Sequence, residues 1–319
     1  MVRDLYRSSA RRLEPLYAEL LADLAADART WFHHARTLSV AVRRVGEFAA
    51  GERQLIGTVK NAFVDAMAAR GHHFTIDAAA PDLPLVVRLD DDGSVVVSLD
   101  LGGASLSQRG WRREQGAAPL REHLAAVMLM LARFDPRHDV LVDPMCGAGT
   151  IAIEGVLAAR APARPLTAAG RALSPRPCTD ALFADAQPVV IAGDADLDAL
   201  LAAKANLAAA GVVDDVVLRR ADARRLDRGE LAALAGERGR RADRGLVLCN
   251  PPYGERLGGD ELLELYADLG DACRRLGAGW RGGFLVANPD FERAFGPPPR
   301  IKKPLSNGNL RAYFFLYDF

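Results

Sequence analysis

The chain has 319 residues, of which 50% are hydrophobic, and its formal net charge is +0. This length fits one large domain or two modest domains, and the apolar content is sufficient for a sizeable core. A balanced charge neither requires nor excludes a nucleic-acid partner, because local patches matter more than the sum.

The sequence shows no signal for targeting and none for metal binding. No apolar run has the length of a membrane span, and no signal peptide precedes the first predicted helix, so we expect a cytosolic protein. The cysteines have no metal-ligand spacing, which predicts reduced, structural thiols and no metal site. They are Cys146, Cys178, Cys249 and Cys273.

Residues 1–35 are amphipathic and rich in arginine. Their leucines recur with helical spacing, which predicts a helical segment that packs on the next domain. The alternative is a basic arm that faces nucleic acid. The leucines are Leu13, Leu16, Leu20, Leu21 and Leu24.

Residues 36–115 are predicted to form a small α/β domain. Two alternating apolar runs flank the turn residues Asp91-Asp92-Gly93, which predicts a β-hairpin. The predicted elements are a strand at 38–42, a helix at 54–69 and hairpin strands at 85–89 and 94–99.

The segment from Arg109 to Arg113 combines basic side chains with Trp111. In one interpretation, Trp111 and the arginines stack on and neutralise a nucleic acid. In the other, which is equally favoured, the segment is a wedge between domains. A helix at 119–131 is then predicted to open the second domain, residues 116–319.

The stretch from Leu141 to Thr150 has the pattern of a strand, a glycine turn and a helix. Gly147 and Gly149 allow a sharp turn or the close approach of a ligand. The stretch lacks the third glycine of the dinucleotide fingerprint and the Lys-Ser/Thr of a phosphate loop. Asp143, at the strand end, repels a polyphosphate and favours a cationic or hydroxyl-rich ligand, such as S-adenosylmethionine.

Two further acids follow predicted strands. The strand at 189–192 leads to Asp194, and an acid in this position can accept both hydroxyls of a ribose. The strand at 216–218 leads to Asp222, which is a second candidate for binding a ligand and for which a helix cap is the simpler interpretation. The Pro-rich insertion at 161–188 and the charged helical stretch at 224–244 carry no chemistry that their composition identifies.

Asn250-Pro251-Pro252-Tyr253 follows an apolar strand, Gly245 to Cys249. Asn250 offers an amide acceptor and donor, and the two prolines make the loop rigid and leave its carbonyl oxygens to accept. Such a loop suits a planar amino group, with the ring of Tyr253 to stack beside it. The simpler interpretation is a proline turn with a capping Asn. A helix at 261–276, a strand at 283–287 and a hairpin of 301–305 with 310–317 complete the chain.

The motifs that begin at Asp143 and Asn250 together resemble those of the class I S-adenosylmethionine-dependent methyltransferases that modify exocyclic amines. Residues 105–112, 118–126 and 307–310 narrow the resemblance to the THUMP-domain RNA guanine-N2 methyltransferases of bacteria and archaea. This family acts on large-subunit ribosomal RNA or on transfer RNA.

The resemblance runs from about Arg36 to the C-terminus. It implies an α/β fold, in which a small THUMP-like RNA-binding domain at 36–115 precedes a seven-stranded, Rossmann-like methyltransferase domain at 116–319. It also implies S-adenosylmethionine as the cofactor and ribosomal or transfer RNA as the partner.

The site residues implied by the resemblance fall into three groups. Those that bind the cofactor are Asp143, Met145, Cys146, Gly147, Gly149, Thr150, Asp194, Ala195, Asp222, Ala223 and Asn250. Those that carry catalysis are Asn250, Pro251, Pro252 and Tyr253. Those that bind the substrate are Tyr253, Arg109, Trp111 and Arg256.

Two alternatives remain at this point. Asn-Pro-Pro-Tyr also occurs in DNA adenine-N6 and protein glutamine-N5 methyltransferases. The second alternative is a protein of a different class, namely an RNA-binding protein that keeps the fold but has no catalytic turnover. The intact glycine and proline loops argue against it, because a retired site has no chemical reason to keep both.

Overall fold

A computed structural model of the chain describes residues 2–27, 35–44, 48–102, 106–114, 119–160, 183–253, 259–308 and 310–319. These residues form two compact units that divide between Ser105 and Leu106. The division comes before the predicted boundary at 115, because the segment 106–114 packs with the second unit. Trp111, for example, is 4% exposed and lies in the core of that unit.

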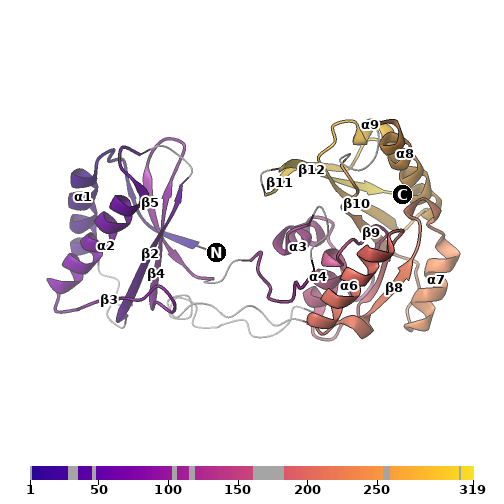
Figure 1. Cartoon of the computed structure of the whole chain (residues 1–319), viewed down its shortest axis with the longest axis horizontal. Coiled ribbons are helices and arrows are strands. Elements are labelled where there is room, and N and C mark those ends of the chain that lie inside the picture. Colours follow the sequence, from indigo (N-terminus) through magenta and orange to yellow (C-terminus); the bar gives the residue numbers. More distant parts are fainter. Residues whose placement is uncertain are drawn as a thin grey trace. The chain divides into compact units, whose positions relative to one another are not determined.

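The first unit is a five-stranded sheet with two helices (Figure 1). The sheet order is β1-β5-β4-β2-β3, in which β2 runs parallel to β4 and β3, and β5 runs antiparallel to β1 and β4. The strands are β1 (Val2–Ser8), β2 (Thr37–Arg44), β3 (Thr75–Ile76), β4 (Leu83–Leu89) and β5 (Val95–Asp100), and the helices are α1 (Leu13–Ala26) and α2 (Glu52–Ala68).

Both helices of the first unit lie on one face of its sheet (Figure 1). Leu16, Leu20 and Leu24 of α1 are buried in the same cluster as alternate residues of β4 and β5. Alternation puts every second side chain of a strand on one face, so the hairpin pattern in the sequence already marked this core. The predicted hairpin is confirmed, with Leu89 opposite Val95.

The expectation that residues 1–35 are helical throughout is wrong for residues 2–8, which form β1. This strand pairs antiparallel with β5, so that Val2 lies opposite Asp100 and Ser8 opposite Val95. The partner strand lies far along the chain, and local helical spacing carries no signal for such a pairing.

The second unit holds a seven-stranded sheet of order β11-β12-β10-β9-β6-β7-β8. Strands β8, β7, β6, β9 and β10 are parallel, whereas β12 is antiparallel to both β10 and β11. The strands are β6 (Val140–Asp143), β7 (Val189–Asp194), β8 (Val216–Arg220), β9 (Gly245–Cys249), β10 (Trp280–Val286), β11 (Ile301–Asn307) and β12 (Leu310–Asp318).

Helices cover both faces of this sheet (Figure 1). One hydrophobic cluster lies under α3, α4 and α6, and a second lies under α7, α8 and α9. The helices are α3 (Glu122–Leu131), α4 (Thr150–Arg160), α6 (Leu197–Ala209), α7 (Arg228–Glu237), α8 (Gly259–Leu276) and α9 (Phe291–Phe295), with short 3-10 helices η2 (Val213–Asp215) and η3 (Ala223–Arg225). This doubly wound arrangement brings the carboxyl ends of β6, β7, β8 and β9 to one edge.

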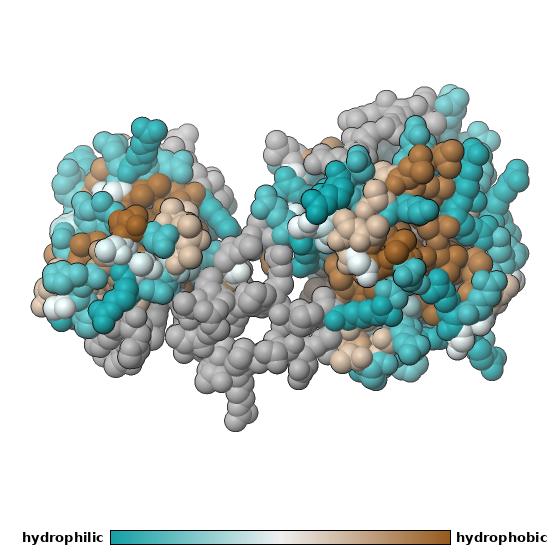
Figure 2. All heavy atoms as spheres, turned by 60° about the horizontal axis from the view of Figure 1, so that its bottom comes forward, coloured by the Kyte–Doolittle hydropathy of each residue, from teal (hydrophilic) through white to brown (hydrophobic). Residues whose placement is uncertain are grey.

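The charged stretch at 224–244, predicted to be helical, contains the helix α7 only from Arg228 to Glu237. Residues 161–182 of the predicted insertion lie outside the described residues. None of the described helices combines the length and the apolar character needed to cross a membrane. The face of each unit drawn in Figure 2 is mostly polar with apolar areas between, and among the exposed large apolar residues are Leu197 and Leu201 of α6.

Candidate active site

The turn between β6 and α4 carries two glycines in the left-handed region. Gly147 has φ 50° and Gly149 has φ 82°, a conformation that favours glycine. At Gly149 a Cβ would lie 3.3 Å from the Cβ of Ala203 on α6. A Cβ placed on Gly147 would have no atom of the described residues within 4 Å, apart from those of Gly147 and its two chain neighbours. The turn is therefore packed closely against α6 at one glycine and open at the other.

Asp194, at the end of β7, stabilises this turn by hydrogen bonding. Its carboxylate accepts a hydrogen bond from the Gly147 amide at 2.9 Å and one from the Asp196 amide at 3.0 Å. The Cys146 amide donates to the Gly193 carbonyl at 2.8 Å. The ends of β6 and β7 are thus joined through the carboxylate that the sequence assigned to a ribose.

Asp143 is buried at the end of β6, with 1% of its surface exposed. Its Oδ1 has no hydrogen-bond partner in the described part of the chain. Burial raises the pKa of this carboxyl well above its ordinary range; the Met145 amide opposes the shift, and the nearby Asp194 adds to it. A buried carboxylate oxygen without a hydrogen-bond partner is costly, and a cationic group beside it would compensate that cost.

Asp222 follows β8 and caps η3, which was the alternative interpretation of this residue. Its carboxylate accepts from the Arg224 amide at 3.0 Å and pairs with the Arg224 guanidinium at 2.7 Å. That guanidinium is the main cause of the lowered pKa of Asp222. The cap leaves Asp222 ionised at the rim of the site, beside the buried Ala223.

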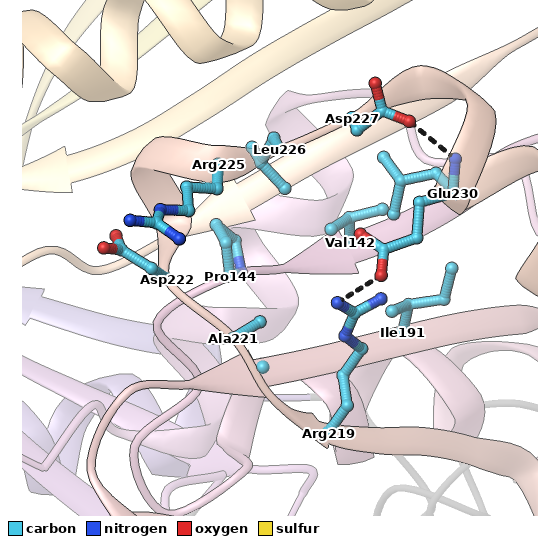
Figure 3. A pocket seen from close by; sticks show the side chains of 12 residues that line it. Val142, Pro144, Ile191, Arg219, Ala221, Asp222, Arg225, Leu226, Asp227 and Glu230 are labelled. Atoms are coloured by element: carbon cyan, nitrogen blue, oxygen red, sulfur yellow. Dashed lines mark hydrogen bonds and ion pairs between the residues drawn. The ribbon is translucent and has the colours of Figure 1, made fainter.

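A small pocket opens beside Asp222 (Figure 3). Its walls are mainly apolar, and an ion pair between Arg219 and Glu230, 2.5 Å apart, borders it. Lining side chains from β6, β7 and α7 include Val142, Ile191 and Leu231, and Ala221, which directly follows β8, lines the pocket as well. The pocket adjoins the strand ends at which Asp143 and Asp194 lie.

The Asn250-Pro251-Pro252-Tyr253 loop leaves β9, the neighbour of β6 in the sheet. Tyr266 of α8, which is fully buried, donates its hydroxyl hydrogen bond to the Pro252 carbonyl at 2.6 Å. The Tyr253 hydroxyl donates to Asn250 Oδ1, and burial raises the pKa of Tyr253. An amide oxygen has two lone pairs, so Asn250 can accept one further hydrogen bond.

Arg109 and Trp111 take up positions inside the second unit. Arg109 forms a bidentate pair with the buried Glu154 of α4, at 3.1 and 2.9 Å. Burial raises the pKa of Glu154 to about 7, against the opposing effect of Arg109. Contact of Arg109 and Trp111 with RNA stays a prediction, and it is one that this packing does not favour. Arg256 lies outside the described residues.

The remaining cofactor candidates lie around the same edge. Cys146 is 6% exposed, and burial raises the pKa of its thiol. Thr150 begins α4 and accepts from Arg112 at 3.0 Å. The carbonyl of Ala195 accepts from Arg220 Nε at 3.1 Å. Within the described ranges, no group of three or more His, Cys, Asp or Glu side chains is arranged to hold a metal ion.

Sequence reasoning did not single out Asn206, Glu122 or Glu154, which are all buried polar residues near this edge. A signal for Asn206 exists in the sequence. It is a polar residue on the apolar stripe of α6, three and six positions after Ala203 and Leu200. A polar side chain in such a stripe requires hydrogen-bond partners in the folded chain.

The strand order and the glycine turn define a class I methyltransferase fold. Residues 109–313 match the family described as RMKL-like, methyltransferase domain, and the chain belongs to this family.

Among curated relatives, the chain is 38% identical over 273 residues to the ribosomal RNA large subunit methyltransferase K/L of Stutzerimonas stutzeri, an alignment that covers 79% of this chain and 36% of that protein. It is 35% identical over 338 residues to the protein of the same name from Syntrophotalea carbinolica, covering 97% and 45%. The chain therefore spans less than half the length of these relatives.

Among solved structures, a putative methyltransferase complexed with SAH superposes with a TM-score of 0.75 at 25% identity, covering 99% of this chain and 83% of that one. TrmN from Thermus thermophilus gives a TM-score of 0.61 at 23% identity and covers 99% and 81%. The second likeness concerns the fold alone.

Proposed function

We propose that this chain transfers a methyl group from S-adenosylmethionine to the exocyclic N2 of a guanosine in ribosomal or transfer RNA. The observation that carries the proposal is that the glycine turn after β6 and the Asn250–Tyr253 loop after β9 leave neighbouring strands at the same edge of the sheet. The turn after β6 contains the buried carboxylate of Asp143, whose Oδ1 has no partner among the described residues, and Tyr266 anchors the loop after β9 through the Pro252 carbonyl. The relatives named as ribosomal RNA methyltransferases support the choice of RNA.

The residues at the first loop fit the cofactor. Asp143 has an acceptor oxygen without a partner, which suits the cationic amino group of S-adenosylmethionine. The open space at Gly147 admits a ligand close to the backbone. Asp194 would hold the ribose, and Asp222 and Ala223 would border the adenine. The similar structure that contains SAH supports the choice of cofactor.

S-adenosylmethionine supplies an electrophilic methyl group on a sulfonium. Asn250 Oδ1 and the Pro251 carbonyl would accept hydrogen bonds from the guanine –NH2 and direct the nitrogen lone pair along the line of transfer. The N–CH3 bond would form as the S–CH3 bond breaks, S-adenosylhomocysteine would leave, and the methylated nitrogen would release one proton to solvent. The Tyr253 ring would stack on the base, and its hydroxyl keeps the Asn250 amide oriented. The residues thus contribute mainly orientation, which is worth several kcal/mol in such reactions, roughly 7–11 at best.

We also propose that the first unit is a THUMP-like domain that docks structured RNA. Its run from β2 to β5 contains the expected order of strand, helix, strand and strand, with the two-residue strand β3 added between α2 and β4. Basic side chains on such a domain would contact phosphates and position the RNA without reading its sequence.

The test is an incubation of the purified protein with labelled S-adenosylmethionine and unmodified total RNA, followed by digestion to nucleosides and mass spectrometry. Labelled N2-methylguanosine is the expected product. Label in N6-methyladenosine or in a protein glutamine would replace the guanosine assignment. Tight binding of the cofactor without label in any acceptor would identify an RNA-binding protein that has lost turnover.

A further inference from the structure

The segment 106–114, called the strap below, lies against the elements that form the glycine turn. Trp111 of the strap is buried in the core under α3, α4 and α6. Arg112 donates from Nη2 to Thr150 Oγ1 at 3.0 Å and to the Leu120 carbonyl at 2.8 Å, and its Nε pairs with the buried Glu122 at 3.0 Å. The strap therefore contacts the first residue of α4 directly.

Asn206 of α6 connects the same strap to the turn itself. Its Oδ1 accepts from the backbone amides of Arg113 at 2.7 Å and Glu114 at 3.0 Å. Its Nδ2 donates to the carbonyls of Glu114 and Ala148, each at 3.0 Å. Asn206 is fully buried, and these bonds use all the hydrogen-bonding capacity of its amide.

The hydrogen bond from Asn206 to the Ala148 carbonyl is placed to hold the glycine turn. Ala148 lies between Gly147 and Gly149, which both have positive φ. Glycines permit many backbone conformations, so the turn needs an external contact to hold one of them. The Ala148 carbonyl is held by Asn206 on one side, and the Gly147 amide is held by Asp194 on the other.

We propose that Asn206 is a positioning residue that couples the strap to the glycine turn, so that the turn keeps its ligand-binding conformation only while the strap is seated. The expected effect of this coupling on S-adenosylmethionine affinity rests on the proposed function. The coupling itself is a property of the folded chain and can be measured without a cofactor.

The main variant is Asn206→Asp. It keeps the shape of the side chain and its acceptor oxygen but loses both donors, and it places a carboxylate against the carbonyls of Glu114 and Ala148. We expect the dissociation constant for S-adenosylhomocysteine and the KM for S-adenosylmethionine to rise about tenfold. The kcat at saturating cofactor should change by less than about twofold, because no residue that contacts the base is altered.

The matched control is Leu207→Ala, the next residue on α6, which is fully buried but makes no polar contact with the turn. It creates a cavity and lowers the unfolding temperature, yet we expect it to leave the cofactor KM unchanged. Arg112→Lys tests the same coupling from the strap if Asn206→Asp fails to fold. Lysine keeps the charge beside Glu122 but cannot donate to Thr150 and Leu120 as the guanidinium does.

Hydrogen exchange on this chain without cofactor completes the test. Asn206→Asp should accelerate exchange in residues 106–114 and 144–150 together, whereas Leu207→Ala should not. Unchanged exchange in either segment would overturn the coupling, as would an equal rise in KM in both variants. If the wild-type chain binds no S-adenosylhomocysteine, the proposed function fails, and the exchange measurement still decides the coupling.

Discussion

The ligand-binding role proposed for Asp143 would come at the expense of the stability of the fold. Its carboxyl is buried, and its Oδ1 has no partner within the described ranges. Its pKa is raised, so the folded state prefers the protonated form. The carboxyl therefore destabilises the fold increasingly as the pH rises from the ordinary carboxyl range, about 4, through the raised pKa.

We expect Asp143→Asn to raise the unfolding temperature of the apo protein at pH 7, because the amide has no charge to bury. This gain should vanish below about pH 4, where the carboxyl is protonated in both states. The same variant should weaken S-adenosylhomocysteine binding about tenfold or more, since it loses a charged hydrogen bond. Thermal unfolding across pH and titration calorimetry measure the two effects, and an unchanged affinity would exclude Asp143 as the partner of the amino group.

Asn250 is the residue on which the proposed transfer depends. We expect Asn250→Ala to lower kcat about 100-fold, because the substrate amine loses its orientation, while S-adenosylhomocysteine affinity stays within about threefold. Tyr253→Phe is the companion variant. It keeps the ring and removes only the hydroxyl that holds the Asn250 amide, so we expect a smaller loss of kcat. Single-turnover assays and calorimetry separate the effects, and equal losses of binding and turnover in Asn250→Ala would argue against its role.

At the scale of elements, a buried carboxylate joins three parts of the second unit. Asp139, which is fully buried directly before β6, pairs with Arg244 ahead of β9 and with Arg281 of β10, both at 2.5 Å. It also accepts from the Asp135 amide at 2.8 Å. This cluster lies at the amino ends of the strands, opposite the candidate site.

We expect Asp139→Ala to destabilise the protein by about 3–5 kcal/mol, because it leaves two guanidinium groups without their carboxylate. Arg244 is half-exposed and can regain water, which favours the lower end of that range. Denaturant unfolding measures the change. Arg241→Ala, which removes an exposed pair with Asp243, is the control and should alter stability by less than about 1 kcal/mol.

Two helical glycines give opposite expectations for the same substitution. At Gly270 in α8, a Cβ would collide with the Phe295 carbonyl at the end of α9. A Cβ at Gly236 in α7 would have no atom within 4 Å among the described residues outside its own stretch of helix. Gly236→Ala should therefore stabilise the protein by up to about 1 kcal/mol through helix propensity. Gly270→Ala should destabilise it by about 1–3 kcal/mol through overpacking. Stabilisation by both substitutions would contradict the packing of α8 on α9.

At the scale of the whole molecule, each unit has its own hydrophobic core. The first is built from α1, α2 and one face of the five-stranded sheet, and the second from both faces of the seven-stranded sheet. The strap belongs to the second unit although it directly follows the first in the chain. The proposed division of labour assigns RNA docking to the first unit and the cofactor to the second.

A chain that begins at Leu106 keeps the strap and tests this division. We expect its affinity for S-adenosylhomocysteine to stay within about twofold of the full chain, and its affinity for RNA to fall about tenfold or more. The salt dependence of RNA binding should also become less steep, because phosphate contacts are lost. Calorimetry and filter binding at several salt concentrations measure these quantities, and unchanged RNA affinity would remove the docking role from the first unit.

Much of the fold and part of the site could be predicted because their signals are local. The hairpin of β4 and β5, the strand–turn–helix around Gly147 and Gly149, and the closing hairpin of β11 and β12 are all encoded in short runs of residues. Acids at the ends of β7 and β8 were visible because parallel strands bring their carboxyl ends to one edge.

Only the tertiary structure decided which distant groups meet. The partner of β1 is β5, Trp111 is buried in a core, and Asn206 holds both the strap and the turn. Each depends on packing between segments that lie tens of residues apart, and a local pattern is the same whichever partner is present. The sequence by itself therefore determined the elements and the polar residues at their ends, whereas long-range burial and hydrogen bonding determined which polar side chains stay available at the candidate site and which hold the structure together.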